Sequence, residues 1–285
     1  MKNSPIYERL DKALHKRQEE RQFRSIPSFI NNNDVIDLST NSYLSLHKNE
    51  EVLQTAHQLS HNLSAGNLAS RLVSEQSPLF SELESEIASW KKTETALIFN
   101  SGYAANIGII QALCTKDTEV FCDRLNHASI YDGISLSGAK LNRYFHNDME
   151  DLRKRLHAST SKEKLIITDT VFSMDGDRAL LGDICDLAEQ YSCMVMVDEA
   201  HGTGIFGPDG SGLTEESGVT DSVDIIMGTL SKAIAGLGGY CAVSKKLRDY
   251  FVNFCRSFIY STALPHSVLA HNLSAIRYIR KNPGL

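Results

Sequence analysis

The stretch Asp224-Ile-Ile-Met-Gly-Thr-Leu-Ser-Lys232 leads an apolar strand directly into a lysine. Glycines follow at once, at Gly236, Gly238 and Gly239. A lysine between an apolar strand and a glycine-rich turn is not in the setting of an ordinary solvated surface lysine. The position therefore predicts a functional amine at the end of a buried strand.

A second apolar strand ends on a carboxylate: Met194-Val-Met-Val197 precedes Asp198. A lysine at a strand end, beside the hydroxyls of Thr229 and Ser231, suits the Schiff base and the phosphate of pyridoxal phosphate. A buried carboxylate at position 198 would keep the pyridine nitrogen of that cofactor protonated. Together, Asp198 and Lys232 predict an electron-sink cofactor and carbanion chemistry at an amino acid.

The composition limits the partners of the chain. Of its 285 residues 42% are hydrophobic, and the net charge is −6, so a nucleic-acid surface rich in Lys and Arg is not expected. The six cysteines form no CxxC pair, which predicts a reduced, cytoplasmic protein. The ten histidines show no metal-ligand spacing, and no apolar run reaches the roughly 18 residues that span a bilayer. We therefore expect no nucleic-acid, membrane or metal partner.

Strand and helix patterns alternate from residue 78 onward. The predicted strands are 95–99, 119–122, 141–145, 164–169, 193–198, 224–228 and 239–243. The predicted helices are 79–90, 103–114, 127–137, 148–158, 181–191, 245–257 and 266–280. This alternation predicts an α/β fold with a mostly parallel, seven-stranded sheet between helices. Upstream, 1–24 and 49–63 carry helical patterns, and Val35-Ile-Asp-Leu38 is strand-like.

Ligands of such sheets bind at the C-terminal ends of the strands, where several polar motifs lie. Ser101-Gly102-Tyr103 starts a helix and predicts either a phosphate site or an ordinary strand–helix turn. His127 predicts either a ring stacked on a cofactor or a polar residue at a helix start. Ser173-Met-Asp-Gly-Asp177 predicts equally a substrate-facing loop or a simple turn.

Two motifs that would indicate other classes of enzyme lack the residues that those classes require. Asp198-Glu-Ala-His201 spells the DEAH of helicases, but the chain contains no Gly-Lys dipeptide and so no phosphate-binding GxxxxGK[ST] loop. Thr229-Leu-Ser-Lys232 fits a loose [ST]xxK pattern of serine hydrolases, with threonine in place of the required serine.

Five motifs, taken together and in order, resemble those of the α-oxoamine synthases. They are Ser101-Gly102-Tyr-Ala-Ala-Asn106, Asn126-His127-Ala-Ser129, Val171-Phe-Ser173-Met-Asp-Gly-Asp177, Val197-Asp198-Glu-Ala-His201-Gly-Thr-Gly204 and Thr229-Leu-Ser-Lys232. The resemblance runs from about Asn41 to Pro265. It implies a fold-type I pyridoxal phosphate enzyme, an acyltransferase that joins an amino acid to an acyl thioester with loss of CO2.

The resemblance also implies the catalytic roles. Lys232 would carry the cofactor and later move the Cα proton, and Asp198 would pair with the pyridine nitrogen. His201 would hydrogen-bond the phenolic oxygen, and His127 would stack on the ring.

Further residues would hold the phosphate and the substrate. The cofactor-binding residues beyond the catalytic four would be Ser101, Gly102, Tyr103, Ser173, Thr229, Ser231, Ser261 and Thr262. Ser261 or Thr262 would reach the phosphate of a neighbouring subunit, which implies a homodimer with shared active sites. Asn41 and Ser173 would lie near the substrate.

Three stretches favour one member of the family, the one that condenses L-alanine with a pimeloyl thioester of coenzyme A or a carrier protein in biotin synthesis. They are Ser70-Arg-Leu-Val-Ser74, Ser173-Met-Asp-Gly-Asp177 and Ile259-Tyr-Ser-Thr262. The nearest rival is 2-amino-3-ketobutyrate CoA ligase, followed by other α-oxoamine synthases.

The sequence departs from the family in length and at three positions. We expect an N-terminal helix and arm (1–45), a large cofactor-binding domain (46–265) and the start of a linker helix (266–285) to a small C-terminal domain that is missing. A truncated non-catalytic subunit, or one half of a split enzyme, is therefore a second hypothesis. Ser45 and Glu75 stand where the family has glycine, and Phe80 stands where it commonly has histidine; a positive φ at position 75 would strain it.

Overall fold

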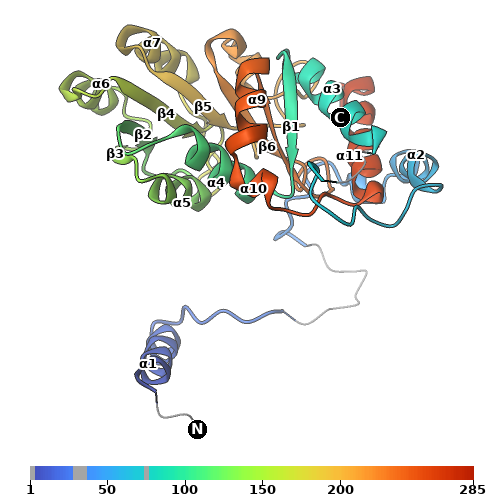
Figure 1. The fold of residues 1–285 in the computed structure, drawn as a ribbon, viewed down its shortest axis with the longest axis horizontal. Helices are drawn as coiled ribbons and strands as arrows, with labels where there is room; N and C mark the ends of the chain where they lie inside the picture. The colour runs from blue at the N-terminus through green and yellow to red at the C-terminus, as the bar shows by residue number, and fades with distance from the viewer. Residues whose placement is uncertain (1–3, 28–36, 74–76) are drawn as a thin grey trace. The chain divides into compact units, whose positions relative to one another are not determined.

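The computed structural model describes residues 4–27, 37–73 and 77–285, and the chain divides into two units, Met1–Ser39 and Thr40–Leu285. In the first unit, α1 (Pro5–Glu19) begins where the Ser4 hydroxyl accepts a hydrogen bond from the Ile6 amide (Figure 1). All residues of α1 are solvent-exposed. The predicted N-terminal helix is confirmed, with tighter bounds.

The second unit contains the predicted seven-stranded sheet. Its strands are β1 (Thr95–Phe99), β2 (Thr118–Asp123), β3 (Lys140–Tyr144), β4 (Glu163–Asp169), β5 (Met194–Asp198), β6 (Ile225–Thr229) and β7 (Gly239–Val243). The spatial order is β1-β7-β6-β5-β4-β2-β3. Strands β2 to β6 pair in parallel, whereas β7 runs antiparallel to both β1 and β6. The prediction of a mostly parallel sheet is confirmed.

Helices cover both faces of this sheet (Figure 1). The longer helices are α2 (Glu50–Ser60), α3 (Pro78–Lys91), α4 (Gly102–Leu113), α5 (Ala128–Ser137), α6 (Met149–Ala158), α7 (Leu181–Tyr191), α9 (Lys245–Phe254) and α11 (His266–Lys281). The shorter ones are η1 (Leu46–Lys48), α8 (Leu213–Glu216), η2 (Thr220–Ser222) and α10 (Arg256–Ile259). Two separate apolar cores result: α3, α6, α7 and α11 close one, and α4, α5, α9 and α10 close the other.

Strand β1 shows how the two cores share the sheet. Ala96 and Ile98 belong to one core, and Leu97 and Phe99 belong to the other. Successive side chains of a strand point to opposite faces, so a strand buried on both sides is apolar throughout. This explains why the segment that forms β1 appears in the sequence as a mostly apolar run.

The predicted helix 245–257 is wrong: the chain forms α9 and α10 with a break at Cys255. Cys255 is fully buried and extended, and the Ser257 hydroxyl donates to the Ala104 carbonyl on α4 at 2.6 Å. Gly108 on α4 faces these side chains, and a Cβ there would collide with Ser257 and Cys255. Close packing against α4 therefore outweighs the helical pattern of the segment.

The strand-like piece Val35-Ile-Asp-Leu38 is not confirmed. Its first two residues lie outside the described residues, and Asp37 and Leu38 are not in a strand. Across the described ranges, no helix combines the length and apolarity needed to cross a membrane.

A buried ion pair holds the segment that follows β5. The ammonium group of Lys91 on α3 contacts the carboxylate of Glu199, and both side chains are almost completely buried. Lys91 also donates to Thr203 Oγ1 at 3.1 Å, while Glu199 accepts from the amide and the hydroxyl of Thr214 at 2.8 and 3.0 Å. The pair thus joins α3 to both ends of the loop that begins at Asp198.

We predict that Lys91→Met lowers the free energy of unfolding by about 3–5 kcal/mol, because it leaves the Glu199 charge buried without its partner. The double variant Lys91→Met/Glu199→Gln should recover part of this loss. Denaturant unfolding measures both. Lys92→Met is the matched control, because the ion pair of Lys92 with Glu215 lies at the surface, and it should cost little. A loss at Lys91 no larger than that at Lys92 would contradict the interpretation.

Candidate active site

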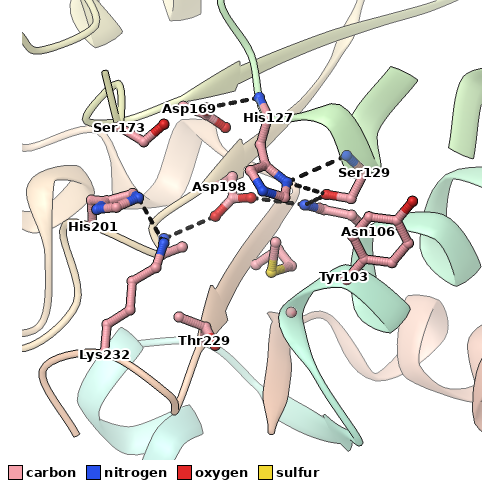
Figure 2. Close-up of a pocket in the computed structure, with 13 residues that line it drawn as sticks. Tyr103, Asn106, His127, Ser129, Asp169, Ser173, Asp198, His201, Thr229 and Lys232 are labelled. Atoms are coloured by element: carbon pink, nitrogen blue, oxygen red, sulfur yellow. Dashed lines mark hydrogen bonds between the residues drawn. The ribbon is translucent and has the colours of Figure 1, made fainter. Parts of the chain in front are cut away.

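A cavity of about 140 Å³ opens at the C-terminal ends of β4, β5 and β6, beside the first turns of α4 and α5 (Figure 2). Eight residues predicted from the sequence line it: Gly102, Tyr103, His127, Ser173, Asp198, His201, Thr229 and Lys232. Five more lining residues were not predicted: Asn106, Ser129, Asp169, Ala200 and Met227. The fold thus gathers residues from five separate sequence motifs around one space.

The other predicted residues lie outside the lining. Ser101 caps α4, with its hydroxyl accepting from the Ala104 amide at 3.0 Å. Ser231 accepts a 3.3 Å hydrogen bond from the Thr229 hydroxyl. Asn41 is not part of the lining, and its side-chain oxygen accepts a hydrogen bond from the Tyr43 hydroxyl at 3.1 Å.

Ser261 and Thr262 lie apart from this cavity. Thr262 pairs with Ser70 in an isolated bridge, and its carbonyl accepts from the Asn100 side chain at 2.6 Å. Within the described part of one chain, they do not line the space that contains Lys232.

Two buried carboxylates stand side by side in the cavity wall. Asp169 and Asp198 are register partners on β4 and β5, and each is 4% exposed. Asp198 accepts from the Asn106 side chain and the Ala200 amide, both at 2.8 Å (Figure 2). Asp169 accepts from the His127 amide at 3.0 Å through one oxygen, while its other oxygen has no hydrogen-bond partner among the described residues.

The two carboxylates differ in their protonation. Burial raises the pKa of both, and the neighbouring charge of Asp198 raises that of Asp169 further, well above its usual range. At Asp198 the donors Asn106 and Ala200 oppose the effect of burial, and so does the nearby Lys232. Two adjacent carboxylates do not ionise equally, so Asp169 is the more readily protonated of the pair and Asp198 the more readily ionised.

Lys232 and His201 are hydrogen-bonded in the opposite wall. The Lys232 ammonium nitrogen lies 2.7 Å from His201 Nε2 (Figure 2). Burial lowers the pKa of Lys232, although Asp198 and Asp169 oppose the shift. Burial, Lys232 and His127 together lower the pKa of His201 to about 4. His201 is therefore neutral near pH 7, and Lys232 is more readily deprotonated than a surface lysine.

His127 is the polar residue at a helix start that the sequence allowed, and its ring also lines the cavity. As the N-cap of α5 its Nδ1 accepts from the Ser129 amide at 3.3 Å and lies 2.7 Å from the Ser129 hydroxyl. Its ring also forms part of the cavity wall, edge-on to Tyr103 with centroids 6.4 Å apart. The cap fixes the orientation of the ring.

The backbones of β7 and of the start of α4 come very close to each other beside the cavity. A Cβ on Gly239 would lie 2.7 Å from the Gly102 amide nitrogen, and one on Gly102 would lie 3.3 Å from the Thr229 Cβ. Only glycine allows β7 and the start of α4 to come this close. The first amides of an α-helix have no acceptor within the helix, so this helix start favours an anion.

The Ser173–Asp177 segment is a turn that also borders the cavity. Gly176 has a φ of +75°, and its amide donates to the Phe172 carbonyl at 2.8 Å. His146 Nε2 lies 2.8 Å from Asp177 Oδ2 and anchors the far end of the turn. Ser173 lines the cavity, so this turn also forms part of the cavity wall.

The unusual positions differ in their consequences. Ser45 adopts the left-handed conformation, with a φ of 52°, which glycine would adopt without strain. Phe80 is buried and packs under the Arg71 guanidinium, whose carbon lies 4.0 Å from the ring centroid. Glu75 lies outside the described residues. Within those residues, no three His, Cys, Asp or Glu side chains gather as a metal site requires.

Comparison with known proteins agrees with this geometry. Residues 33–281 match the model of the family described as aminotransferase class I and II. The chain belongs to this family and, within it, to the α-oxoamine synthases.

Individual relatives narrow the position within the family. The chain is 46% identical over 249 residues to a putative 8-amino-7-oxononanoate synthase of Halalkalibacterium halodurans, covering 87% of this chain and 63% of the relative. It is 44% identical over 284 residues to the 8-amino-7-oxononanoate synthase of Trichlorobacter lovleyi, covering 96% and 73%. A high-resolution structure of SPT with PLP superposes with a TM-score of 0.90 at 30% identity, covering 98% and 76%. The chain thus spans just under two thirds of the length of the first of these relatives.

The environment of His201 leads to a pH prediction. A histidine whose pKa is lower in the folded than in the unfolded state remains neutral while the unfolded chain takes up a proton. Its contribution to stability is therefore present above the usual pKa of about 6.5 and is lost as the pH falls towards about 4. Histidine ring resonances followed by NMR should show one site that titrates near pH 4 and is absent in His201→Gln. Titration of that site near 6.5 would contradict the burial argument.

Proposed function

We propose that this chain binds pyridoxal phosphate and serves the decarboxylative condensation of L-alanine with a pimeloyl thioester, the reaction that yields 8-amino-7-oxononanoate in biotin synthesis. The observation that carries the proposal is that a lysine with a lowered pKa and the buried carboxylate of Asp198 line the same cavity. Relatives at 44–49% identity that bear the name 8-amino-7-oxononanoate synthase support this member over 2-amino-3-ketobutyrate CoA ligase.

The donor and acceptor groups of the cavity fit this cofactor. A protonated pyridine nitrogen needs a buried anion, and Asp198 is one. Asp169 and Asn106 each keep one buried side-chain oxygen without a partner among the described residues, so the site has unused polar capacity. The helix start at Gly102 and Tyr103 suits a phosphate.

In the proposed site each residue has one task. Lys232 would carry the cofactor, and His127 would pack against the face of its ring. Asp198 would hold the proton on the pyridine nitrogen, and His201 would hydrogen-bond the phenolic oxygen. When bound, pyridoxal phosphate supplies an electron sink that stabilises negative charge at the Cα of the amino acid.

The remaining predicted residues complete the proposed site. The phosphate would be held by the amides of Gly102 and Tyr103 and by the hydroxyls of Thr229 and Ser231, with Ser101 fixing the helix start. Ser173 and Asn41 would lie near the substrate.

Lys232 would also move the proton at Cα. A base must be unprotonated to accept a proton, and the burial that lowers its pKa increases the neutral fraction of Lys232 near pH 7. The negative charge that the Asp198–Asp169 pair carries opposes this effect, so part of the basicity of the amine is kept.

We further propose a cytoplasmic homodimer in which Ser261 or Thr262 completes the site of the partner. The stretch around Thr262 lies beside the stretch around Ser70, where the Ala263 amide donates to the Ala69 carbonyl at 3.0 Å. Large apolar side chains are exposed on both: Leu68, Leu72, Val73 and Tyr260. Such clusters mark interaction surfaces. Sedimentation at about twice the chain mass of 31.6 kDa supports the dimer, and a monomer at micromolar concentration would contradict it.

The cofactor proposal predicts a visible absorption band when pyridoxal phosphate is added to the purified chain. Borohydride should remove this band and leave a pyridoxyl group on Lys232, which peptide mass spectrometry would locate. L-Alanine added before borohydride should change the band and protect Lys232 from labelling, which tests the amino-acid half of the reaction.

Two variants make this experiment specific. Lys232→Ala should lose both the band and the label, whereas Lys246→Ala, at an exposed lysine on α9, should keep both. Absence of a band at saturating cofactor, or a label spread over surface lysines, would overturn the proposal.

A further inference from the structure

A chain of hydrogen bonds runs from the N-terminal end of the second unit to Lys232. The Tyr43 hydroxyl lies 2.7 Å from His201 Nδ1, and His201 Nε2 lies 2.7 Å from the Lys232 nitrogen. At its outer end the Tyr43 hydroxyl donates to Asn41 Oδ1 at 3.1 Å. Residues 158 positions apart in the chain are thus joined by direct contacts.

The core holds Tyr43 in place independently of the cavity. Leu46, three residues further on, is 1% exposed and belongs to the apolar core, and Leu44 packs against the same core. Between them Ser45 takes the left-handed turn that starts η1. The position of the Tyr43 hydroxyl is therefore set by packing.

The donor and the acceptor of each hydrogen bond in this chain follow from Asn41, at the outer end. Asn41 Oδ1 is an acceptor, so it takes the single proton of the Tyr43 hydroxyl, and the Tyr43 oxygen is left to accept. It accepts from Nδ1–H of His201. A neutral imidazole carries one N–H, so His201 Nε2 presents a lone pair to Lys232.

We propose that Tyr43 is a positioning residue for Lys232: with Asn41 it holds His201 in the Nδ1–H tautomer, which keeps the lone pair of the lysine amine free. In this tautomer Nε2 accepts an N–H of Lys232. In the other tautomer Nε2–H would donate to the amine lone pair, which is the pair that must attack a carbonyl or take a proton. This inference rests on the proposed function of Lys232.

Burial and, after it, the charges of Lys232 and His127 keep His201 neutral, as the argument requires. The ionisable groups that act on His201 are Lys232 and His127, and Tyr43 contacts its other nitrogen. The carboxylates that act on Lys232 are Asp198 and Asp169.

The first test is the tautomer of His201 in the cofactor-free chain. Nitrogen-15 NMR of the histidine rings, assigned with His201→Gln, should show Nδ1 protonated and Nε2 unprotonated. Tyr43→Phe keeps the ring but removes the hydroxyl, and should give a mixture of both tautomers. Tyr250→Phe is the matched control: Tyr250 is similarly exposed, at 39% against 43%, and its hydroxyl donates to the Ala112 carbonyl at 3.0 Å.

The second test is the reactivity of Lys232 without cofactor. Its rate of acetylation by acetic anhydride, followed by peptide mass spectrometry, should rise with pH to a plateau. In Tyr43→Phe the maximal acetylation rate at high pH should fall about fivefold, because loss of one net hydrogen bond changes an equilibrium by about this factor. The pH at which the rate is half-maximal should not rise. Asn41→Asp retains an acceptor oxygen and should keep the wild-type tautomer, whereas Asn41→Leu should behave like Tyr43→Phe.

The outcomes separate the two proposals. An unchanged tautomer in Tyr43→Phe, or an equal change in Tyr250→Phe, would overturn the role of Tyr43. Because both measurements use the cofactor-free chain, they can support this role even if pyridoxal phosphate does not bind, and that result would contradict the proposed function alone.

Discussion

The rest of the site depends on keeping a negative charge on Asp198 inside the protein. A buried carboxylate is costly unless donors or a cation compensate it. Here Asn106 and the Ala200 amide supply two hydrogen bonds to Asp198. The raised pKa of the adjacent Asp169 favours its protonated form, which would remove a second charge that repels Asp198. Lys232 supplies the cation. Asp198, Asp169 and Lys232 therefore set one another's protonation.

Strand pairing, a buried ion pair and core packing hold the side chains of the site in this arrangement. Parallel strands bring Asp169 and Asp198 to one edge of the sheet in register, and β6 delivers Thr229 to the same edge. The buried Lys91–Glu199 pair fixes the loop that carries His201. Tyr43, held by Leu46 in the core, contacts His201 from outside. His201 is thus held by Tyr43 and by the Lys91–Glu199 pair, which do not themselves line the cavity.

Much of this could be predicted from the sequence because the signals are local. Helix 181–191 and strands 95–99 and 239–243 have the predicted bounds, since apolar periodicity and turn residues determine them. Asp198 and Lys232 were recognisable because each follows a buried strand. The break between α9 and α10 at Cys255 could not be recognised from the sequence, because packing against α4 produces it. Asp169 ends a buried strand as Asp198 does, and a register argument would have found it. Tyr43 gave no signal, since its partner lies far along the chain.

The ring nitrogen of bound pyridoxal phosphate tests the role of Asp198 most directly. Cofactor labelled with nitrogen-15 at this position reports by its NMR shift whether the nitrogen is protonated. We predict a protonated nitrogen that stays protonated well above the pKa of the free cofactor, and the loss of that proton in Asp198→Asn. An unprotonated ring nitrogen in the wild-type chain at neutral pH would contradict the account.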